Sequence, residues 1–243
     1  MGQFKQRVVI VTGAGSGVGR ALVETFVREG AQVALVGRRQ SLLNETAANL
    51  PPDQTLICPC DVTDRSAVDD MVDTVGSRFG ALDILVNNAG VNFSPRTVAE
   101  IDPADWDRIV AINLTGAFNT LRAVLPAMRR QKGGLIVNIA SIAGLRGSKI
   151  SGAAYSASKH GVIAMSQALN EEEAAYNIRS CAICPGEIDT PMLDQRPVPT
   201  PADRRALILQ PQDVADAVRF VAAYPPRVCI PLLVIKPTVQ IFR

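Results

Sequence analysis

A tyrosine and a lysine stand four residues apart, at Tyr155 and Lys159, in a stretch whose pattern predicts a helix. Residues at i and i+4 of a helix share one face, with Cβ atoms about 5–6 Å apart. A free tyrosine has a pKa of about 10 and exchanges protons poorly at neutral pH. An ammonium group within ~4–6 Å favours the phenolate and would lower this pKa by about 1–3 units, which would make Tyr155 a general acid/base. The alternative is an unrelated pair on a solvated helix.

The elements that position this pair alternate along the whole chain. The apolar runs that predict strands are residues 8–11, 33–36, 55–58, 84–87, 135–139, 179–184 and 232–235. The helical patterns between them cover residues 18–29, 40–49, 65–79, 103–130, 153–176 and 212–223. Continuous apolar strands indicate a parallel sheet buried on both faces, and strand–helix repetition predicts a doubly wound α/β fold. We expect residues 1–243 to form one Rossmann-type domain with about seven strands. A proline-rich stretch, 191–201, predicts a substrate loop near 190–206.

Composition excludes several classes of function. The 243 residues carry a formal net charge of +2, and Lys and Arg are scattered, which argues against nucleic acid or an anionic membrane as the main partner. No apolar run approaches 18 residues and the N-terminus has no secretory h-region, so we expect a cytoplasmic protein.

The five cysteines do not resemble a disulfide framework, and no metal site is expected. Cys181 and Cys184 lie on a predicted strand, where i and i+3 point to opposite faces. The single histidine, His160, points about 100° away from Lys159 on the helix. We therefore expect all five cysteines in the core and a packing role for His160.

A glycine-rich turn follows the first predicted strand and opens directly into a helix. Its candidate cofactor residues are Gly13, Ser16, Gly17, Val18 and Gly19. Glycines let a backbone approach a pyrophosphate closely, and a helix N-terminus supplies free N–H groups. Arg20 follows the last glycine, so the stretch is no Walker loop. The alternative is a turn without a ligand.

The end of the second strand bears on the choice between two dinucleotides. A carboxylate at this place binds the ribose 2′-hydroxyl of NAD, whereas a 2′-phosphate needs a cation. Here Gly37 is followed by Arg38 and Arg39, which favours NADP(H) over NAD(H). The alternative is a pair of solvated arginines at a helix start.

Two further strand ends supply candidate cofactor contacts. Asp61 and Val62 follow the third strand and could hold an adenine, or Asp61 could cap a helix. Asn88, Ala89 and Gly90 form a turn after the fourth strand that could border the cofactor.

These motifs, in this order and spacing, resemble the short-chain dehydrogenase/reductase family from about Arg7 to Thr190. The likeness rests on the glycine-rich turn, the Asn-Asn-Ala-Gly turn, Tyr155-x-x-x-Lys159 and Pro185-Gly186. It implies a catalytic tetrad of Asn113, Ser141, Tyr155 and Lys159. It also implies that Pro185, Gly186, Ile188 and Thr190 border the nicotinamide, together with Tyr155 and Lys159. The alternatives are that Ser141 is an ordinary turn residue after a strand and that Asn113 is a polar helix residue whose hydrogen bonds are met within the protein.

The resemblance implies a role for each member of the tetrad. Tyr155 exchanges a proton with the substrate oxygen as hydride moves, and Ser141 hydrogen-bonds the same oxygen. Lys159 lowers the pKa of Tyr155 and holds the nicotinamide ribose. Asn113 steadies a water that links Lys159 to solvent. The resemblance also implies a homodimer or homotetramer formed through helices 103–130 and 153–176.

Two departures from the family pattern concern the substrate. The gap between Ser141 and Tyr155 is about one residue longer than the commonest spacing, and residues 147–152 absorb it. The ending 229–243 lacks an Asp-Gly-Gly-type close and resembles a branch that acts on small hydroxy acids. The expected pocket lining is Phe93, Ser94, Leu145, Arg146, Met192, Leu193 and Arg196.

The sequence thus favours an NADP(H)-dependent oxidoreductase for a small carbonyl or secondary alcohol, with 3-oxo and 3-hydroxy acids among the candidates. Arg146, Lys149 or Arg196 could bind a substrate carboxylate or be surface charges. Two other classes stay open: a non-redox enzyme of the same fold, such as an epimerase or dehydratase, and an NADP-binding redox sensor.

Overall fold

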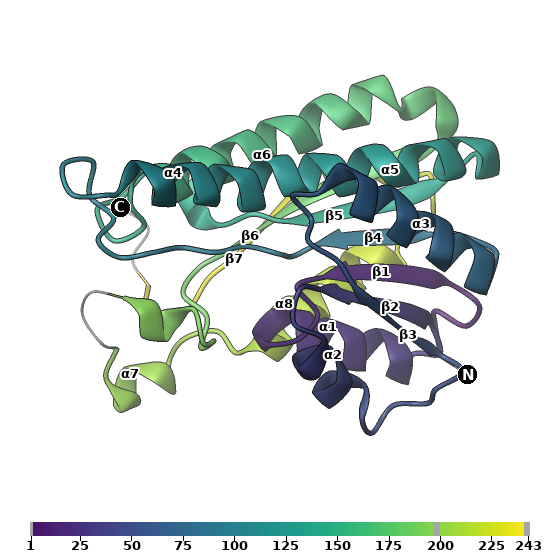
Figure 1. Cartoon of the computed structure of the whole chain (residues 1–243), viewed down its shortest axis with the longest axis horizontal. Coiled ribbons are helices and arrows are strands. Elements are labelled where there is room, and N and C mark those ends of the chain that lie inside the picture. The colour runs from purple at the N-terminus through teal and green to yellow at the C-terminus, as the bar shows by residue number, and fades with distance from the viewer. Residues whose placement is uncertain (1, 197–199, 241–243) are drawn as a thin grey trace.

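Seven parallel strands form one sheet in the computed structural model, which describes residues 2–196 and 200–240. The strand order is β3-β2-β1-β4-β5-β6-β7, and each neighbouring pair runs parallel. Helices cover both faces of the sheet (Figure 1). The strands are Val8–Thr12 (β1), Gln32–Gly37 (β2), Thr55–Pro59 (β3), Ile84–Asn87 (β4), Gly134–Ile139 (β5), Ile178–Pro185 (β6) and Leu232–Ile235 (β7). The predicted doubly wound α/β fold is confirmed.

The longer helices match the predicted ones, with short turns added between them, among them a 3₁₀ turn at Ile142–Gly144. They are Gly17–Arg28 (α1), Gln40–Ala47 (α2), Arg65–Phe79 (α3), Pro103–Val110 (α4), Gly116–Gln131 (α5), Ala153–Glu172 (α6), Ala202–Arg205 (α7) and Pro211–Ala223 (α8). A π-helical turn, Ala111–Thr115, separates α4 from α5, and a 3₁₀ turn, Ala174–Tyr176, follows α6. The predicted loop near 190–206 contains α7 and a 3₁₀ turn, Leu193–Gln195, and its residues 197–199 lie outside the described residues.

Alternate residues of each strand pack on opposite faces of the sheet, although the strands are apolar throughout. On β1, Val9 and Val11 join the core formed with α1 and α8, where Phe26 is fully buried. Val8 and Ile10 join the core formed with α3 and α5. Burial of a side chain of this size stabilises the fold by about 1.5–3 kcal/mol. Two such layers fix the sheet and therefore the loops at its edge.

Local signals set the ends of the helices beside the site. Asp64 caps α3 by accepting hydrogen bonds from the backbone N–H groups of Ser66 and Ala67. Asp102 caps α4, and Pro103 follows at the first helical position. Asp61 therefore does not cap α3; its carboxylate accepts hydrogen bonds from Thr63 instead.

The stretch Pro103–Gln131 is long and apolar enough to cross a membrane by length and composition alone. Leu121 and Val124 of this stretch are buried against the sheet. A core helix of a folded protein passes the same test, so this finding is weak evidence for a membrane span.

Four of the five cysteines lie in the core as predicted, and the prediction for Cys229 is wrong. Cys58, Cys60, Cys181 and Cys184 are buried, whereas Cys229 is exposed. Cys229 lies in the loop between α8 and the edge strand β7. Cys181 and Cys184 pack in different apolar clusters, which confirms that their sulfurs diverge.

Candidate active site

The glycine-rich turn lies where the strand order reverses, between β1 and β4. In sheets of this kind ligands bind at the carboxyl ends of the strands at this point. Gly13 has a φ of +67° and Gly17 a φ of +50°, both in the left-handed region that favours glycine. A Cβ on Gly13 would lie 2.9 Å from Asn88 Nδ2, and one on Gly17 would lie 3.2 Å from Thr190 Cγ2. Glycine at these two positions therefore keeps side-chain atoms out of the turn.

The start of α1 is available to an anion. Ser16 occupies the N-cap position without a side-chain hydrogen bond to the helix, and no acidic residue lies in the first turn. The first N–H groups of a helix carry a partial positive charge and bind phosphate readily. These residues fit the pyrophosphate of a dinucleotide.

Hydrogen bonds tie the end of β1 to the turn after β4. Thr12 Oγ1 accepts hydrogen bonds from the backbone N–H groups of Asn88 at 2.9 Å and Ala89 at 3.0 Å. Asn88 Nδ2 donates to the carbonyl oxygens of Thr12 at 2.9 Å and Gly13 at 3.4 Å. The turn 88–90 therefore both shapes the sheet edge and borders the pocket.

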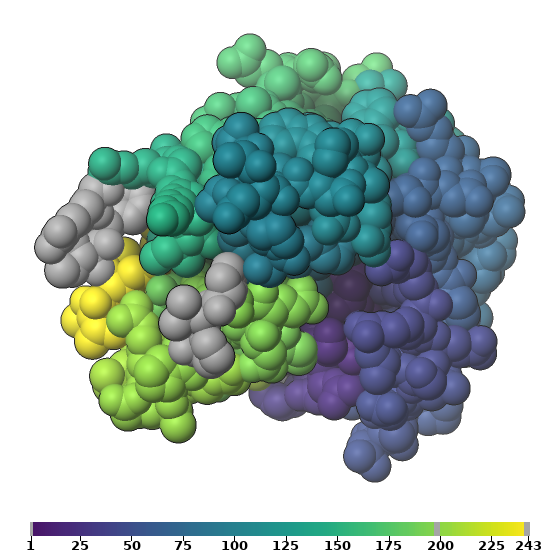
Figure 2. Space-filling model, turned by 60° about the vertical axis from the view of Figure 1, so that its left-hand side comes forward, coloured from purple at the N-terminus to yellow at the C-terminus, as the bar shows by residue number. Residues whose placement is uncertain are grey.

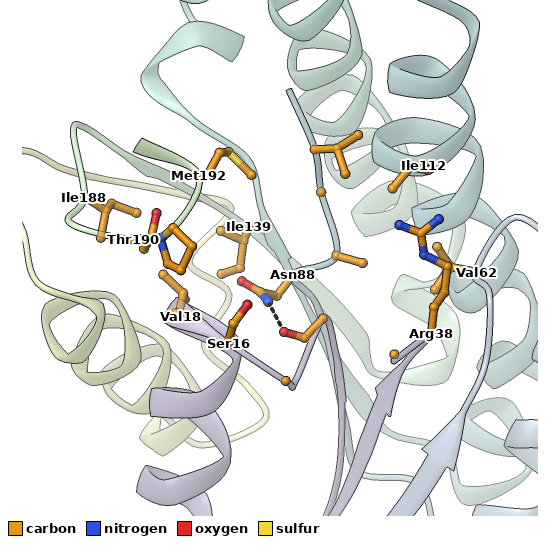
Figure 3. A pocket seen from close by; sticks show the side chains of 18 of the residues that line it. Ser16, Val18, Arg38, Val62, Asn88, Ile112, Ile139, Ile188, Thr190 and Met192 are labelled. Atoms are coloured by element: carbon orange, nitrogen blue, oxygen red, sulfur yellow. Dashed lines mark hydrogen bonds between the residues drawn. The ribbon is translucent and has the colours of Figure 1, made fainter. Parts of the chain in front are cut away.

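The pocket above this edge runs from the end of β2 to the segment after β6. Figure 3 shows Arg38 and Val62 on one side, Ile188, Thr190 and Met192 on the other, and Asn88 and Ile139 between them. Of the residues proposed to contact a cofactor, the lining includes Gly13, Ser16, Gly17, Val18, Arg38, Arg39, Asp61, Val62, Asn88, Ala89, Gly90, Tyr155, Lys159, Pro185, Gly186, Ile188 and Thr190. The lining also includes residues without a sequence signal, which are Leu42, Cys60, Ile112 and Ile139, and it includes Met192, which was expected to line the substrate pocket.

Gly19 is placed differently from the other glycines of the turn. It is buried beneath the turn, outside the pocket lining, and a Cβ there would run into the carbonyl oxygen of Gly13. Gly19 thus allows α1 to pack closely on β1.

A cation occupies the far end of the pocket. Arg38 follows β2 and lies 3.8 Å from the carboxylate of Asp61, and both side chains are about half exposed. An exposed pair of this kind contributes only about 0–1 kcal/mol, so a phosphate can displace Asp61 from Arg38 at little cost. Arg39 is the exposed N-cap of α2. No acidic residue follows β2 at the place where a 2′-hydroxyl would be bound.

Tyr155 and Lys159 lie on the same face of α6, as the spacing predicted. Lys159 Nζ is 5.7 Å from the centre of the Tyr155 ring and donates a hydrogen bond of 2.7 Å to the carbonyl oxygen of Ile139. Lys159 is only 4% exposed, and burial lowers the pKa of its ammonium group to about 8. His160 follows on the outside of the helix and is exposed, so the predicted packing role is wrong.

The prediction that Lys159 lowers the pKa of Tyr155 below its ordinary value is wrong. Burial raises the pKa of Tyr155 above its ordinary value, while Ser141 and then Arg96 act to lower it. Lys159 is itself desolvated, and its ammonium does not offset the burial of the phenol. Tyr155 is therefore a neutral phenol at pH 7, which is the form that donates a proton.

Ser141 is ready to donate a hydrogen bond beside Tyr155. Its oxygen accepts from the backbone N–H of Ala143 at 3.1 Å, which leaves the hydroxyl hydrogen free for another acceptor. Ser141 lines both the nucleotide pocket and the pocket next to it.

Asn113 lies in the π-helical turn and is buried. Its amide exchanges two hydrogen bonds with the backbone of Val91, at 2.8 and 3.0 Å, and donates to Ser158 Oγ at 3.2 Å. A Cβ on Gly90 would lie 3.4 Å from Asn113 Oδ1 and 3.6 Å from Lys159 Nζ. Asn113 therefore joins the turn after β4 to α6 beside Lys159, outside the pocket lining. π-helical turns often occur at such functional places.

A second pocket of about 690 Å³ adjoins the first and shares Ser141, Tyr155, Ile188 and Thr190 with it. This volume lies within the usual range for small-molecule sites, about 300–1,000 Å³. Of the expected lining, Arg146, Met192, Leu193 and Arg196 are present, whereas Phe93, Ser94 and Leu145 are not. Phe93 lies instead against the guanidinium of Arg108, 4.5 Å from its ring centre. Lys149 is exposed and outside the lining.

Ion pairs fasten the segment after β6 over this second pocket. Glu187 is buried and accepts from Arg204 at 2.8 Å and from Arg196 at 3.4 Å, and Arg205 pairs with Asp189 and Asp194. The green segment after β6 faces the teal region of α4 across a recess in the surface (Figure 2). Apart from Arg196, this cluster carried no sequence signal, because its ion pairs join α7 to the segment after β6.

The C-terminal segment closes the back of the site. Gln240 Oε1 accepts a hydrogen bond from the backbone N–H of Glu187 at 2.9 Å, and Gly186 leaves room for Gln240 and Pro237. Residues 241–243 of the distinctive ending lie outside the described residues. The described part of the C-terminal segment thus packs against residues 186 and 187, which directly follow β6 at the site.

Comparisons with known proteins agree with this arrangement. The model of the short chain dehydrogenase family matches residues 7–198. An uncharacterised oxidoreductase of Staphylococcus aureus strain USA300 is 36% identical over 231 residues, which cover 95% of this chain and 97% of that protein. A serine dehydrogenase in its closed form with NADP⁺ is 31% identical, with a TM-score of 0.89, and the match covers 97% of this chain and 96% of the other. A 3-ketoacyl-(acyl-carrier-protein) reductase of Brucella melitensis with NADH is 29% identical, also with a TM-score of 0.89, and the match covers 98% and 99%.

Fold and site together define a nicotinamide-dependent oxidoreductase of the Rossmann type. The chain belongs to the short-chain dehydrogenase/reductase family.

Proposed function

We propose that the protein transfers hydride between NADP(H) and a small carbonyl compound or the corresponding secondary alcohol, with Tyr155 as general acid/base. One observation carries this proposal: Tyr155, Ser141 and Lys159 meet where the nucleotide pocket joins the second pocket. A nicotinamide cofactor, when bound, supplies or accepts the hydride.

In the direction of reduction, the phenol of Tyr155 gives its proton to the carbonyl oxygen as that oxygen becomes an alcohol. The Ser141 hydroxyl donates a hydrogen bond to the same oxygen, so the developing negative charge lies opposite two fixed donors. The raised pKa of Tyr155 keeps the phenol protonated at pH 7 and suits it to this direction. Lys159 lines the nucleotide pocket beside Tyr155 and would hold the ribose of the nicotinamide.

Preference for NADP(H) rests on the end of β2. Arg38 supplies a cation that is easily freed from Asp61, Arg39 follows it, and no carboxylate occupies the place that would bind a 2′-hydroxyl. Of the two similar structures above, one holds NADP⁺ and one holds NADH, so these arginines carry the argument.

A compact acid fits the second pocket better than a long chain. Arg96, Arg146, Arg196 and Arg204 line it, and Glu187 is the one carboxylate among its described lining residues. The serine dehydrogenase similar to this chain bears a name that indicates a small hydroxy acid. We therefore propose short oxo acids and hydroxy acids as the first compounds to test.

A spectrophotometric screen tests the function. NADPH oxidation is followed with ketones, aldehydes, oxo acids and the methyl esters of those acids. Turnover with one of these classes supports the proposal. Conversion of substrate without net oxidation of NADPH would favour an epimerase or dehydratase, and NADPH binding without any conversion would favour a redox sensor.

Replacing Lys159 with methionine is expected to stabilise the nucleotide-free protein at pH 7. Burial lowers the pKa of Lys159 from 10.5 to about 8, so the folded state carries a penalty for the charge on the order of 3 kcal/mol. Loss of the hydrogen bond to Ile139 costs about 1 kcal/mol. The net gain of about 2 kcal/mol corresponds to a Tm that is higher by about 4–8 °C, measured by differential scanning calorimetry.

The sign of the pH dependence provides the control. Between about pH 8 and 10.5 the unfolded wild type binds a proton at Lys159 that the folded wild type has lost, so wild-type stability rises with pH in this window. The advantage of Lys159→Met should therefore shrink as pH increases. The exposed Lys149→Met serves as the matched variant and should leave Tm unchanged. A Tm of Lys159→Met below that of the wild type at both pH 7 and pH 10 would contradict the lowered pKa of Lys159.

We further propose a cytoplasmic homodimer or homotetramer formed through α4–α5 and α6. Trp106 on α4 and Phe118 on α5 are 38% and 42% exposed, as expected for helix faces that a second copy covers. Light scattering should give a mass two or four times 25.9 kDa, and Phe118→Glu should lower it. A wild-type mass of 25.9 kDa would rule the assembly out.

A further inference from the structure

Arg96 is a buried cation beside the proposed proton donor. It lies in the loop between β4 and α4, is 7% exposed and lines the second pocket together with Tyr155. Its Nη1 donates to the carbonyl oxygen of Ile150 at 3.1 Å, and its Nη2 donates to that of Gln195 at 2.9 Å. Its Nε is buried and has no hydrogen-bond partner among residues 2–196 and 200–240. A guanidinium has five N–H donors, so most of the hydrogen-bonding capacity of Arg96 is unused.

Further contacts fix the base of the Arg96 side chain, in addition to the two hydrogen bonds of its guanidinium. Gly152, with a φ of +80°, lies directly against Arg96, where a Cβ would come within 2.6 Å of the Arg96 carbonyl oxygen and 2.8 Å of its Cβ. Asn92 Nδ2 bonds the carbonyl oxygen of Ser151 at 3.0 Å and joins the same two loops. The side chain is therefore positioned before a ligand arrives, which lowers the entropic cost of binding.

The charge of Arg96 is not offset by the protein around it. None of the ion pairs among the described residues includes Arg96. Glu187, the carboxylate of this pocket, is already engaged by Arg196 and Arg204. Burial and the like charge of Arg196 lower the pKa of Arg96. A buried charge is costly unless an opposite charge accompanies it, so an anion in this pocket would stabilise the site.

We propose that Arg96 binds the carboxylate of the substrate through Nε and the free hydrogen of Nη2, while Tyr155 meets the reacting oxygen. One small molecule can contact both Arg96 and Tyr155, because the two side chains line the same pocket and lie close enough for the charge of Arg96 to act on the phenol. The substrate class is a short oxo acid in one direction and the hydroxy acid in the other. This inference rests on the proposed function and names the substrate class of the same site.

The other arginines of the pocket are less suited to this role. Arg196 and Arg204 are already paired with Glu187, and Arg146 is exposed. The competing explanation is that Arg96 acts only as a clip that joins the carbonyl groups of Ile150 and Gln195. A clip would affect every substrate equally, whereas a carboxylate site distinguishes an acid from its ester.

The test compares short oxo acids with their own methyl esters in NADPH oxidation by the wild type, Arg96→Met, Arg96→Lys and Arg108→Met. We expect the wild type to prefer the acid, and Arg96→Met to lower kcat/KM for the acid by about 100-fold with little change for the ester. Arg96→Lys keeps the charge but loses the planar guanidinium, so its kcat/KM for the acid should lie between those of the wild type and Arg96→Met. Arg108 lies outside both pockets, so its variant should behave as wild type. Equal losses for acid and ester, or no loss for the acid, would overturn the inference.

A binding measurement separates this inference from the proposed function. Malonate has carboxylates but no carbonyl group that can accept hydride. It should raise the Tm of the NADP⁺-loaded wild type and of Arg108→Met but not that of Arg96→Met. If no carbonyl compound is reduced and this pattern still appears, the redox function fails and the anion site stands. If the carbonyl compounds are reduced but malonate raises the Tm of every variant alike, or of none, the inference about Arg96 fails and the redox function stands.

Discussion

Replacing Tyr155 with phenylalanine is expected to lower kcat/KM for carbonyl reduction by about 10²- to 10⁴-fold, because the substrate oxygen loses its proton donor. The ring and its packing remain, so NADPH should bind with nearly unchanged affinity, as measured by the fluorescence of the bound nucleotide. The hydroxyl groups of Ser141 and Thr190 also line both pockets, but burial raises only the pKa of the Tyr155 phenol, which keeps its proton available for transfer.

Tyr176 offers a matched control for this substitution. It is 40% exposed in the 3₁₀ turn after α6, where the guanidinium of Arg129 lies 5.1 Å from its ring centre. Tyr176→Phe removes the same hydroxyl group far from the pockets and should leave turnover unchanged. Full activity in Tyr155→Phe would remove Tyr155 from the reaction and with it the proposed proton transfer.

Replacing Arg38 with aspartate is expected to shift the ratio of kcat/KM for NADPH over NADH by about 100-fold or more towards NADH. The substitution removes the cation proposed for the 2′-phosphate and places a carboxylate where a 2′-hydroxyl would be bound. Initial rates with each cofactor at a fixed carbonyl substrate give the ratio directly.

The neighbour of Arg38 makes a second variant necessary. Asp61 lies 3.8 Å from Arg38, so an aspartate at position 38 would face a like charge. Arg38→Gln removes the cation without adding a carboxylate and should lose NADPH affinity without gaining NADH affinity. Arg227, exposed in the loop after α8, provides the control Arg227→Asp. An unchanged NADPH preference in both Arg38 variants would show that β2 does not select the cofactor.

Much of the fold followed from periodicity, because two apolar layers leave a strong trace in the sequence. The strands 84–87 and 232–235 and the helix 65–79 were predicted with the bounds observed. The π-helical turn at Ala111–Thr115 left no such trace, since it inserts into a helix whose apolar pattern continues on both sides. The exposure of Cys229 left no such trace either, because it depends on where the loop between α8 and β7 lies in the fold.

The site was predictable where chemistry depends on local spacing. Tyr155 and Lys159 share a face of α6 because they are one turn apart, and the glycine turn sits at the end of β1 because it follows that strand. Arg96 could not be predicted, because its place in the pocket depends on contacts with Ile150 and Gln195, which are remote in sequence. The pKa of Tyr155 was predicted with the wrong sign for a related reason: burial is a tertiary property and here exceeds the effect of the helix neighbour.

The transfer of hydride itself is tested most directly with NADPH that carries deuterium at the reacting carbon of the nicotinamide. The purified protein is incubated with each deuterated form of the cofactor and a short oxo acid, and the product is analysed by mass spectrometry. The account predicts one deuterium on the alcohol carbon from one of the two forms, and none in Tyr155→Phe within the same time. Product that lacks deuterium with both forms, or deuterium transfer that persists at the wild-type rate in Tyr155→Phe, would contradict it.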